Sequence, residues 1–444
     1  MKTSQIRLTA LVLALATELV LCAGCGGTTI NGVSLDKYTL VYDQDSPDYC
    51  LRAAEYIQQQ IMERTGVEIP LCEADSGSYD HEIIVGKSDR GIARHLPEKY
   101  LKNEFYIMAE DGDIALAGDY FLIAAAAYYF VQTYIPGNAF RSEVPEGIST
   151  HTPITEQPNN FIFLIGDGMG VSHTKLFGTL PMPGDVPYHD GEDVFYGYYL
   201  PYQGLVYTYS LSGTTDSAAG ATALACGVKT FNGYVGKDEN LENVQSLTEL
   251  AASKGMATAV MSTDLMTGAT PAGFSAHAEY RGDSKAILAC QQDMMLKNGT
   301  IFECGLDMTD DYQIYVADVL ERLEESENGF FLMYEEGYID KFSHKWNLED
   351  TYASMFRFNQ VIGMFMEYAF YHPDTFLLIT ADHETGGLTV DDGNPEYNYE
   401  GHTNADVPIF AYGQGAEAFR DYHGENVDIP KTIAKLWGVD DFGA

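Results

Sequence analysis

Residues 161–170 read Phe161-Ile162-Phe163-Leu164-Ile165-Gly166-Asp167-Gly168-Met169-Gly170, an apolar run that ends at an aspartate between two glycines. Three later segments, at 257–261, 330–334 and 376–380, are also short and predominantly apolar. Continuous apolar runs of this length are typical of parallel strands that are covered on both faces of a sheet. We therefore predict an α/β fold with a three-layer, doubly wound and mostly parallel sheet.

The polar residues that follow these runs form a set of carboxylates and imidazoles. Ligands of a doubly wound sheet bind beyond the carboxyl ends of its strands, which is where these side chains fall. Carboxylate and imidazole together suit zinc, and magnesium where oxygen dominates. The candidate metal ligands are Asp167, Glu335, Asp340, His344, Asp382, His383 and His402.

A candidate nucleophile lies in residues 214–223, which read Thr214-Thr215-Asp216-Ser217-Ala218-Ala219-Gly220-Ala221-Thr222-Ala223. Ser217 stands where a turn gives way to small helix formers, so we expect its hydroxyl at a helix N-terminus, which favours anions. A serine there also suits a simple N-cap. A metal ion that holds the oxygen deprotonated would instead make Ser217 a nucleophile.

Seven segments of the chain together resemble the alkaline phosphatases and occur in the same order. The resemblance covers about residues 159–414. The segments are Ile165–Gly170, Thr215–Ala219, Gly227–Gly233, Ala269–Pro271, Ile339–Lys341, Thr380–His383 and Gly401–Thr403.

The resemblance implies two Zn²⁺ ions and one Mg²⁺ ion per chain. Three residues would bind the first zinc ion, namely Asp340, His344 and His402. Three others would bind the second zinc ion, with Ser217 as an exchangeable ligand, namely Asp167, Asp382 and His383. Asp167 would also bridge to the magnesium ion, which Thr270 and Glu335 would complete.

The resemblance also implies roles for residues around these ions. Glu335 is preferred to Glu336 as the magnesium ligand because the family's glutamate precedes its aspartate by five positions, as Glu335 precedes Asp340. Arg281 would bind the phosphate and Asp216 would orient Arg281. The chain departs from the family at Gly268, where well-studied members have an aspartate or a histidine near the magnesium ion.

The expected function is hydrolysis of phosphate monoesters through a phosphoserine intermediate on Ser217. A sulfatase would need a proline and an arginine shortly after the nucleophile, and the segment following Ser217 lacks them. Two alternatives stay open. One is a phosphodiesterase of the same superfamily, and the other is a surface lipoprotein that binds a ligand without catalysis.

A smaller α/β accessory domain is expected before the catalytic domain. Strands are predicted at 38–42, 82–86, 104–109 and 114–118, and helices at 48–65 and 122–134. We assign no chemistry to this domain. The predicted boundaries are an accessory domain at 37–135, a proline-rich linker at 136–158 and a catalytic domain at 159–444.

The first residues read as an export signal. Two cations precede an apolar run, and Leu21-Cys22-Ala23-Gly24-Cys25 resembles a bacterial lipoprotein cleavage box. We expect a signal peptide at 1–24, lipidation at Cys25 and a tether at 25–36, with plain secretion as the alternative. The protein would then lie at the cell surface or in the periplasm, held to a membrane by its lipid anchor only.

The net charge and the cysteines set further limits. Among the 444 residues, the formal net charge of −40 excludes nucleic acid as a partner, because a phosphate backbone requires a basic surface. An anionic substrate would need local positive charge, which metal ions and Arg281 would supply. Disulfides 50–72 and 290–304 are compatible with an exported protein, but their spacing does not decide between pairing and free thiols. No oligomeric state is predicted.

Overall fold

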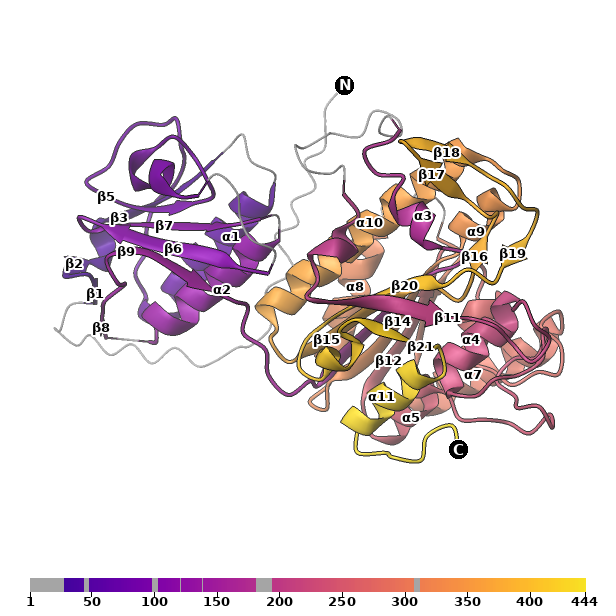
Figure 1. Ribbon diagram of the computed structural model, residues 1–444. Coiled ribbons are helices and arrows are strands. Elements are labelled where there is room, and N and C mark those ends of the chain that lie inside the picture. The colour runs from indigo at the N-terminus through magenta and orange to yellow at the C-terminus, as the bar shows by residue number, and fades with distance from the viewer. Residues whose placement is uncertain are drawn as a thin grey trace, which may run out of the picture. The chain divides into compact units, whose positions relative to one another are not determined.

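The computed structural model describes residues 28–43, 48–97, 103–119, 121–137, 139–180, 194–306 and 312–444. The chain divides after Ile154 into two compact units, each built around its own sheet (Figure 1). The expected signal peptide and Cys25 lie outside the described residues, so export and lipidation stay predictions. None of the helices in the described part combines the length and the apolar character that crossing a bilayer requires.

The N-terminal unit contains a six-stranded mixed sheet in the order β4-β3-β5-β7-β6-β9. Strands β3, β4, β5 and β7 run parallel, and β6 pairs antiparallel with both β7 and β9. Helices α1 (Asp48–Thr65) and α2 (Leu122–Tyr134) pack on each other and on this sheet. The strands are β3 (Tyr38–Tyr42), β4 (Leu71–Glu73), β5 (His81–Val85), β6 (Phe105–Glu110), β7 (Asp113–Gly118) and β9 (Gly147–His151). The prediction of a smaller α/β unit is confirmed.

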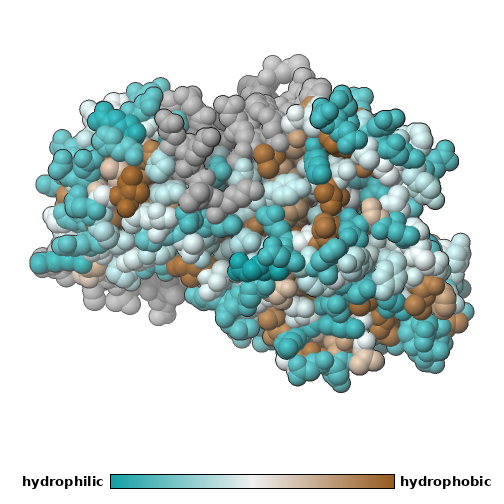
Figure 2. Space-filling model, viewed as in Figure 1, coloured by the Kyte–Doolittle hydropathy of each residue, from teal (hydrophilic) through white to brown (hydrophobic). Residues whose placement is uncertain are grey.

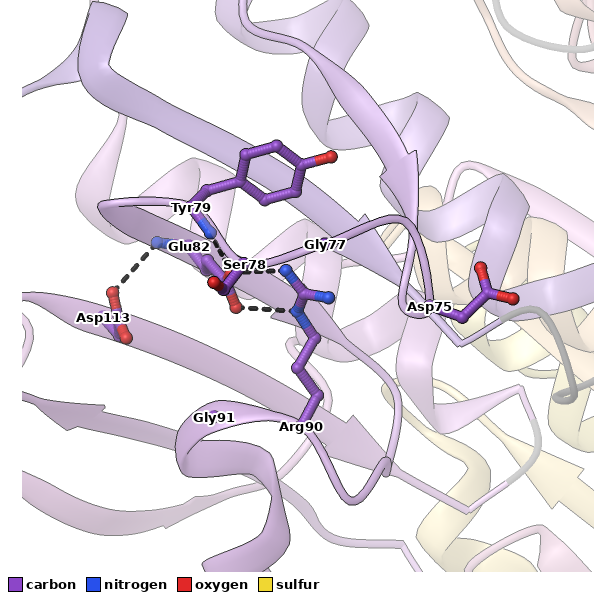
Figure 3. A pocket seen from close by; sticks show the side chains of 8 residues that line it. All are labelled: Asp75, Gly77, Ser78, Tyr79, Glu82, Arg90, Gly91 and Asp113. Atoms are coloured by element: carbon purple, nitrogen blue, oxygen red, sulfur yellow. Dashed lines mark hydrogen bonds and ion pairs between the residues drawn. The ribbon is translucent and has the colours of Figure 1, made fainter.

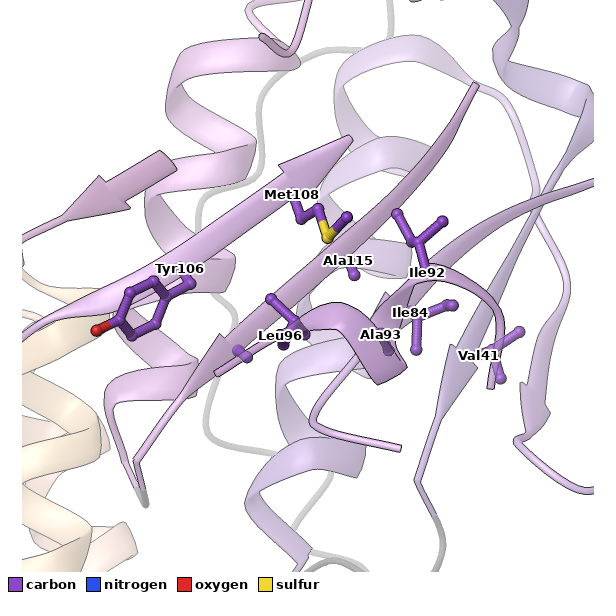
Figure 4. Packing of buried hydrophobic residues seen from close by; sticks show 9 residues of the cluster. Val41, Ile84, Ile92, Ala93, Leu96, Tyr106, Met108 and Ala115 are labelled. Carbon is purple, nitrogen blue, oxygen red and sulfur yellow. The ribbon is translucent and has the colours of Figure 1, made fainter. Parts of the chain in front are cut away.

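A hydrophobic cluster and an ion pair hold the loops of this unit against its sheet. Ile92, Ala93 and Leu96, in and beside a short 3₁₀ segment, pack on side chains of four strands, among them Ile84 and Met108 (Figure 4). In a neighbouring pocket, the Arg90 Nε atom donates to Glu82 Oε2 at 2.9 Å (Figure 3). Arg90 also donates to the backbone oxygen of Ala74. Because Glu82 is buried, this pairing compensates the cost of burying its charge.

Two segments that we expected to be irregular contain strands. Within the expected tether, β1 (Thr29–Ile30) and β2 (Val33–Ser34) form a hairpin across Asn31-Gly32, and both turn residues have positive φ. Asn-Gly is a strong hairpin signal. β1 also pairs with β8 (Arg141–Ser142), inside the expected linker. Residues 141–142 and 147–151, inside the expected linker, are therefore strands that pair within the first unit.

The physical reason at β9 is its position at the edge of the sheet. Its side chains are mostly exposed or half-buried, so the segment lacks the apolar alternation of an inner strand. Pro145 and Pro153 stand outside its two ends, as expected for an edge strand, rather than marking an irregular chain.

The second unit is built on an eight-stranded sheet in the order β13-β12-β14-β10-β15-β20-β11-β21. In the described sheet every strand runs in one direction except β20, which is antiparallel to β15 and β11. The prediction of a mostly parallel sheet is confirmed. The strands are β10 (Asn160–Gly166), β11 (Tyr202–Tyr207), β12 (Ala257–Ser262), β13 (Ile301–Cys304), β14 (Phe330–Glu336), β15 (Thr375–Thr380), β20 (Val407–Tyr412) and β21 (Tyr422–Glu425).

Two groups of helices cover this sheet. The first group is α4 (Ser217–Cys226), α5 (Leu247–Ser253), α6 (Ala269–Gly273) and α11 (Asp428–Leu436), with α7 (Ser284–Asn298) beside it. The second group is α3 (Val171–Thr174), α8 (Tyr312–Glu324), α9 (Tyr338–Ser343) and α10 (Leu348–Tyr371). Two short ladders, β16 (Glu384–Thr385) with β19 (His402–Thr403) and β17 (Thr389–Asp391) with β18 (Asn394–Glu396), follow β15.

The described cysteines form no disulfide with one another. Neither of the pairs considered from the sequence, 50–72 and 290–304, is joined in the structure. Cys226 is fully buried in the second unit, and its burial raises the pKa of the thiol well above its usual value.

Candidate metal centre

The predicted site residues gather at one edge of the large sheet. Three of them lie at or just after the carboxyl ends of parallel strands, and the others lie in or beside short elements there. Asp167 follows β10, Glu335 lies near the end of β14, and Asp382 follows β15. The chain places the other residues beside them, with Ser217 at the start of α4, Thr270 in α6, Asp340 in α9, His344 just after α9, His383 after Asp382 and His402 in β19.

A first group of ligand atoms forms a triangle. The Nε2 atoms of His344 and His402 lie 3.3 and 3.4 Å from Asp340 Oδ1 and 3.1 Å from each other. Ligands at zinc distances around a tetrahedral ion are about 3.3–3.6 Å apart. The triangle therefore has the dimensions of three ligands of one zinc ion.

A second group converges on His383. Its Nε2 atom lies 3.2 Å from Ser217 Oγ, 3.4 Å from Asp167 Oδ1 and 3.3 Å from Asp382 Oδ2. One ring nitrogen carries at most one hydrogen, so it cannot donate a hydrogen bond to two carboxylates and a hydroxyl at once. Among the described residues, Asp167 Oδ1 and Asp382 Oδ2 are buried and have no hydrogen-bond partner. Orphaned carboxylate oxygens in this spacing fit a cation.

Hydrogen bonds fix which nitrogen of two histidines faces these groups. The Nδ1 atom of His402 lies 2.8 Å from the backbone oxygen of Thr215, which can only accept, so Nδ1 carries the proton. Thr385 Oγ1 donates to Asp340 Oδ1 at 2.5 Å and must therefore accept from His383 Nδ1, 3.2 Å away. In both rings the Nε2 lone pair is left for a metal ion.

The third predicted ion would lie near Asp167, Thr270 and Glu335. Glu335 is buried and accepts a hydrogen bond from Ser262, and its charge contributes to raising the pKa of Asp167. Burial raises the pKa of Glu335, and the Thr270 hydroxyl opposes this rise, although Thr270 Oγ1 has no hydrogen-bond partner among the described residues. A buried hydroxyl and two buried carboxylates offer oxygen atoms alone, which are the ligands that Mg²⁺ prefers.

Glu336 points away from this group. Arg357 Nε donates to Glu336 Oε2 at 2.7 Å, and Thr263 Oγ1 and the Tyr338 amide donate to Oε1 at 3.1 and 3.2 Å. Neighbouring residues of a strand face opposite sides, so only one of the two glutamates can face the cluster. The structure places Glu335 there.

The pKa values of the cluster show how unfavourable its negative charges are without cations. Burial, with the charges of Asp382 and Asp340, raises the pKa of Asp167 well above its usual value. Burial also raises the pKa of Asp382 to about 7 and that of Glu335 to about 8. Burial opposes ionisation of Asp340 too, but contact with His402 and the neighbouring imidazoles lowers its pKa. Bound divalent cations would keep all four carboxylates ionised.

The nucleophile candidate sits at the N-terminus of α4, as predicted. Ser217 is buried, and the N-cap residue is Asp216, whose Oδ1 accepts from the Ala219 amide at 3.0 Å. Gly220 lets this helix approach the end of β15, because a Cβ there would lie 3.0 Å from the backbone oxygen of Asp382. Asp216 Oδ2 also accepts from Arg281 at 3.1 Å, so the predicted phosphate-binding residue reaches the same helix end.

Sequence reasoning missed residues that tie these groups together. Thr385 bridges Asp340 and His383, and Ser262 binds Glu335. Thr385 lies two residues after a predicted ligand, which is a weak signal, and Ser262 directly follows a predicted strand. Nothing in the spacing of either residue identifies its partner.

Comparisons with known proteins identify the family to which the chain is similar. The family model described as alkaline phosphatase matches residues 158–303 and 307–399. Alkaline phosphatases 4 and 3 of Bacillus subtilis (strain 168) are each 27% identical, over 54% and 63% of this chain. The matches span 64% and 71% of those two proteins, so the first is matched over less than two thirds of its length.

Solved structures are similar as well. The alkaline phosphatase of the Antarctic bacterium TAB5 is 26% identical, with a TM-score of 0.53 over 63% of this chain and 98% of that one. A variant of the TAB5 enzyme with Mg bound in its M3 site gives a TM-score of 0.54 at 26% identity, over 66% of this chain and 100% of that one. Because the family model matches more than half of the chain, the protein belongs to the alkaline phosphatase family, a family of phosphatase enzymes.

Proposed function

We propose that the protein is a metal-dependent phosphatase that hydrolyses phosphate monoesters through a phosphoserine intermediate on Ser217. The observation that carries this proposal is the convergence of Ser217 Oγ, Asp167 Oδ1 and Asp382 Oδ2 on His383 Nε2, all within 3.4 Å of that atom. Nucleophile and cation ligands therefore share one buried point at a helix N-terminus.

The proposed ligand sets are those implied by the family resemblance. Asp340, His344 and His402 would bind one Zn²⁺. Asp167, Asp382 and His383, with Ser217, would bind the other Zn²⁺, and Asp167, Thr270 and Glu335 would bind Mg²⁺. When bound, the ions would lower the pKa of the Ser217 hydroxyl and neutralise charge on the phosphoryl and leaving-group oxygens.

The residues of the chain would carry out the rest of the reaction. Ser217 Oγ would attack phosphorus in line, forming the O–P bond of a phosphoserine as the bond to the leaving alcohol breaks. Arg281 would bind two phosphoryl oxygens in the bidentate manner that a lysine cannot reproduce. The amides at the start of α4 would favour the anion, and attack by water would then release inorganic phosphate and restore Ser217.

The presence of Arg281 and of the oxygen set around Glu335 favours a monoesterase over a phosphodiesterase. A monoester carries two negative charges on its free oxygens and gains most from a guanidinium and from cations. A diester has only one such charge and a second bulky substituent. The phosphodiesterase is kept as the second candidate because it would use the same nucleophile.

The test compares p-nitrophenyl phosphate with bis-p-nitrophenyl phosphate at alkaline pH, using protein loaded with zinc and magnesium. Monoester turnover should exceed diester turnover and should fall at least about 10³-fold in Ser217→Ala, because the covalent route is lost. Ser284→Ala is the matched control, since Ser284 also begins a helix after an aspartate N-cap. A faster diester reaction would favour the second candidate, and no turnover of either ester by metal-loaded protein would contradict both.

A further inference from the structure

The space beside Gly268 is already filled by a carboxylate. Gly268 stands at the N-cap position of α6, two residues before Thr270, and its φ of −55° is open to any residue. A Cβ built there would lie 2.7 Å from Asp264 Oδ2 and 2.9 Å from the backbone oxygen of Leu265. No side chain fits at position 268 while Asp264 holds this position. An acidic group is therefore present beside the candidate magnesium site, although residue 268 does not supply it.

Asp264 and Glu335 both lie beside Gly337. A Cβ on Gly337 would meet Asp264 Cβ at 3.1 Å and the carboxyl carbon of Glu335 at 3.6 Å. The Asp264 amide donates to Ser262 Oγ at 2.8 Å, and Ser262 in turn donates to Glu335 Oε2. The segment that carries Asp264 therefore fixes the orientation of a candidate magnesium ligand through one hydroxyl.

A lysine fixes the Asp264 carboxylate. Lys341 Nζ lies 2.5 Å from Asp264 Oδ1, and the Leu265 amide donates to the same oxygen at 2.6 Å. Both side chains are partly buried, so the pair is only partly screened by solvent. Oδ1 is thus occupied, whereas Oδ2 is directed to the space over Gly268. Without Asp264, the Lys341 ammonium would stand unpaired near a cation site.

We propose that Asp264 is a positioning residue of the magnesium site. It supplies a carboxylate over Gly268 from the loop after β12, and it neutralises Lys341. Mg²⁺ prefers six oxygen ligands and keeps several waters, and Asp167, Thr270 and Glu335 provide only three protein side chains. The Asp264 Oδ2 atom would accept hydrogen bonds from those waters, and groups in this role typically change metal affinity by about 10–100-fold. The inference rests on the magnesium site of the proposed function.

The test measures Mg²⁺ binding to the zinc-loaded, full-length protein by isothermal titration calorimetry. Asp264→Asn keeps the shape of the side chain and should raise the Kd for Mg²⁺ about 10–100-fold, with zinc content unchanged. Asp293→Asn is the matched control, because it removes an exposed aspartate from an ion pair with Lys297 and should leave the Kd unchanged. The thermal midpoint without Mg²⁺ shows whether Asp264→Asn alters the fold itself.

A double variant separates the two parts of the role. If Asp264 only neutralised Lys341, Asp264→Asn with Lys341→Gln would regain the wild-type Kd, which would overturn the water-binding part of the proposal. A persistent loss of affinity in the double variant supports that part. An unchanged Kd in Asp264→Asn would overturn the inference and leave the proposed function intact. Absence of Mg²⁺ binding to the zinc-loaded wild type would instead contradict the proposed metal set.

Discussion

At the scale of single residues, one carboxylate organises the entrance to the candidate site. Asp216 accepts from the amides of Ala219 and Gly233 and from the guanidinium of Arg281. Three donors on one side chain leave little freedom in its position. Arg281 is held by this contact, while 38% of its side chain stays exposed and able to meet an anion.

We expect Arg281→Lys to weaken phosphate binding more than turnover. A lysine can keep the ion pair with Asp216 but loses the planar fork that binds two oxygens. Loss of one charge-assisted hydrogen bond of about 1.5–3 kcal/mol corresponds to an increase of about 10–100-fold in the inhibition constant for inorganic phosphate. Steady-state inhibition at alkaline pH measures this constant. An unchanged constant would show that Arg281 does not contact the phosphate.

Single residues also show which parts of the site could be predicted from intervals along the sequence. Glu335 was preferred to Glu336 because it precedes Asp340 by five positions. In the structure, Glu336 accepts a hydrogen bond from Arg357 instead. Thr385 and Asp264 could not be predicted in the same way. Their contacts join loops that meet only after the sheet has formed, and neither residue type is unusual where it stands. The spacing of apolar residues shows which face of a helix or strand is buried. It does not show which loops come together beyond the end of that element.

At the scale of elements, the apolar strands and amphipathic helices were the most predictable parts. The segments 38–42, 48–65 and 122–134 were predicted with the bounds that the structure has. Several strands of the large sheet were not predicted, including the inner strands β11 and β20. Four further strands that were missed, β1, β2, β8 and β9, lie at sheet edges or outside the two main cores. Their backbone hydrogen bonds stabilise them without an apolar pattern, and such a pattern is what sequence analysis detects.

An ion pair between α5 and the segment after α6 gives a pH dependence to these elements. His277 Nε2 lies 2.9 Å from Glu249 Oε1, and His277 Nδ1 lies 2.7 Å from the backbone oxygen of Gly236. Burial alone would lower the pKa of His277, but the contact with Glu249 raises it above its usual value. Burial would raise the pKa of Glu249, but the contact with His277 lowers it.

The two shifts have opposite consequences. The stability from His277 is complete below about pH 6.5 and is lost as the pH rises through the raised pKa. The stability from Glu249 is present above about pH 4.5 and is lost as the pH falls through the lowered pKa. The pair therefore contributes most between these two values.

We expect Glu249→Gln to reduce the free energy of unfolding by about 1 kcal/mol at about pH 6 and by clearly less at about pH 9. The amide oxygen can still accept the Ser246 amide hydrogen bond that Glu249 Oε2 accepts at 2.8 Å, so the start of α5 should stay capped. Urea unfolding at both pH values measures the difference. Glu239→Gln, at an exposed position, is the control. Equal losses at the two pH values would show that the pair carries no charge-dependent stability.

At the scale of the whole molecule, negative charge dominates. The formal net charge is −40, and the face seen in Figure 2 is predominantly hydrophilic. Charges of one sign destabilise the folded state through mutual repulsion. The candidate metal centre adds buried carboxylates to this total, and bound cations are the groups that would offset them.

We expect the thermal midpoint of the metal-loaded protein to rise with salt. Between about 0.01 and 0.1 M NaCl the Debye length falls from about 30 Å to about 10 Å, so repulsion between surface carboxylates is screened. A gain of about 1 kcal/mol corresponds to about 2–4 °C for a large domain. Calorimetry in NaCl and in KCl measures the shift, and equal responses distinguish screening from binding of one cation. A midpoint that stays constant or falls would contradict this expectation.

The strand order of the large sheet has a consequence for how the chain is made. Strand β11 lies between β20 and β21, whose residues are synthesised about 200 positions later. The candidate ligands likewise extend from Asp167 to His402. The N-terminal sheet has all its strands once residue 151 has left the ribosome. The large sheet lacks its last strand until residue 425 has been synthesised, and a chain that stops before His402 cannot assemble the candidate metal centre.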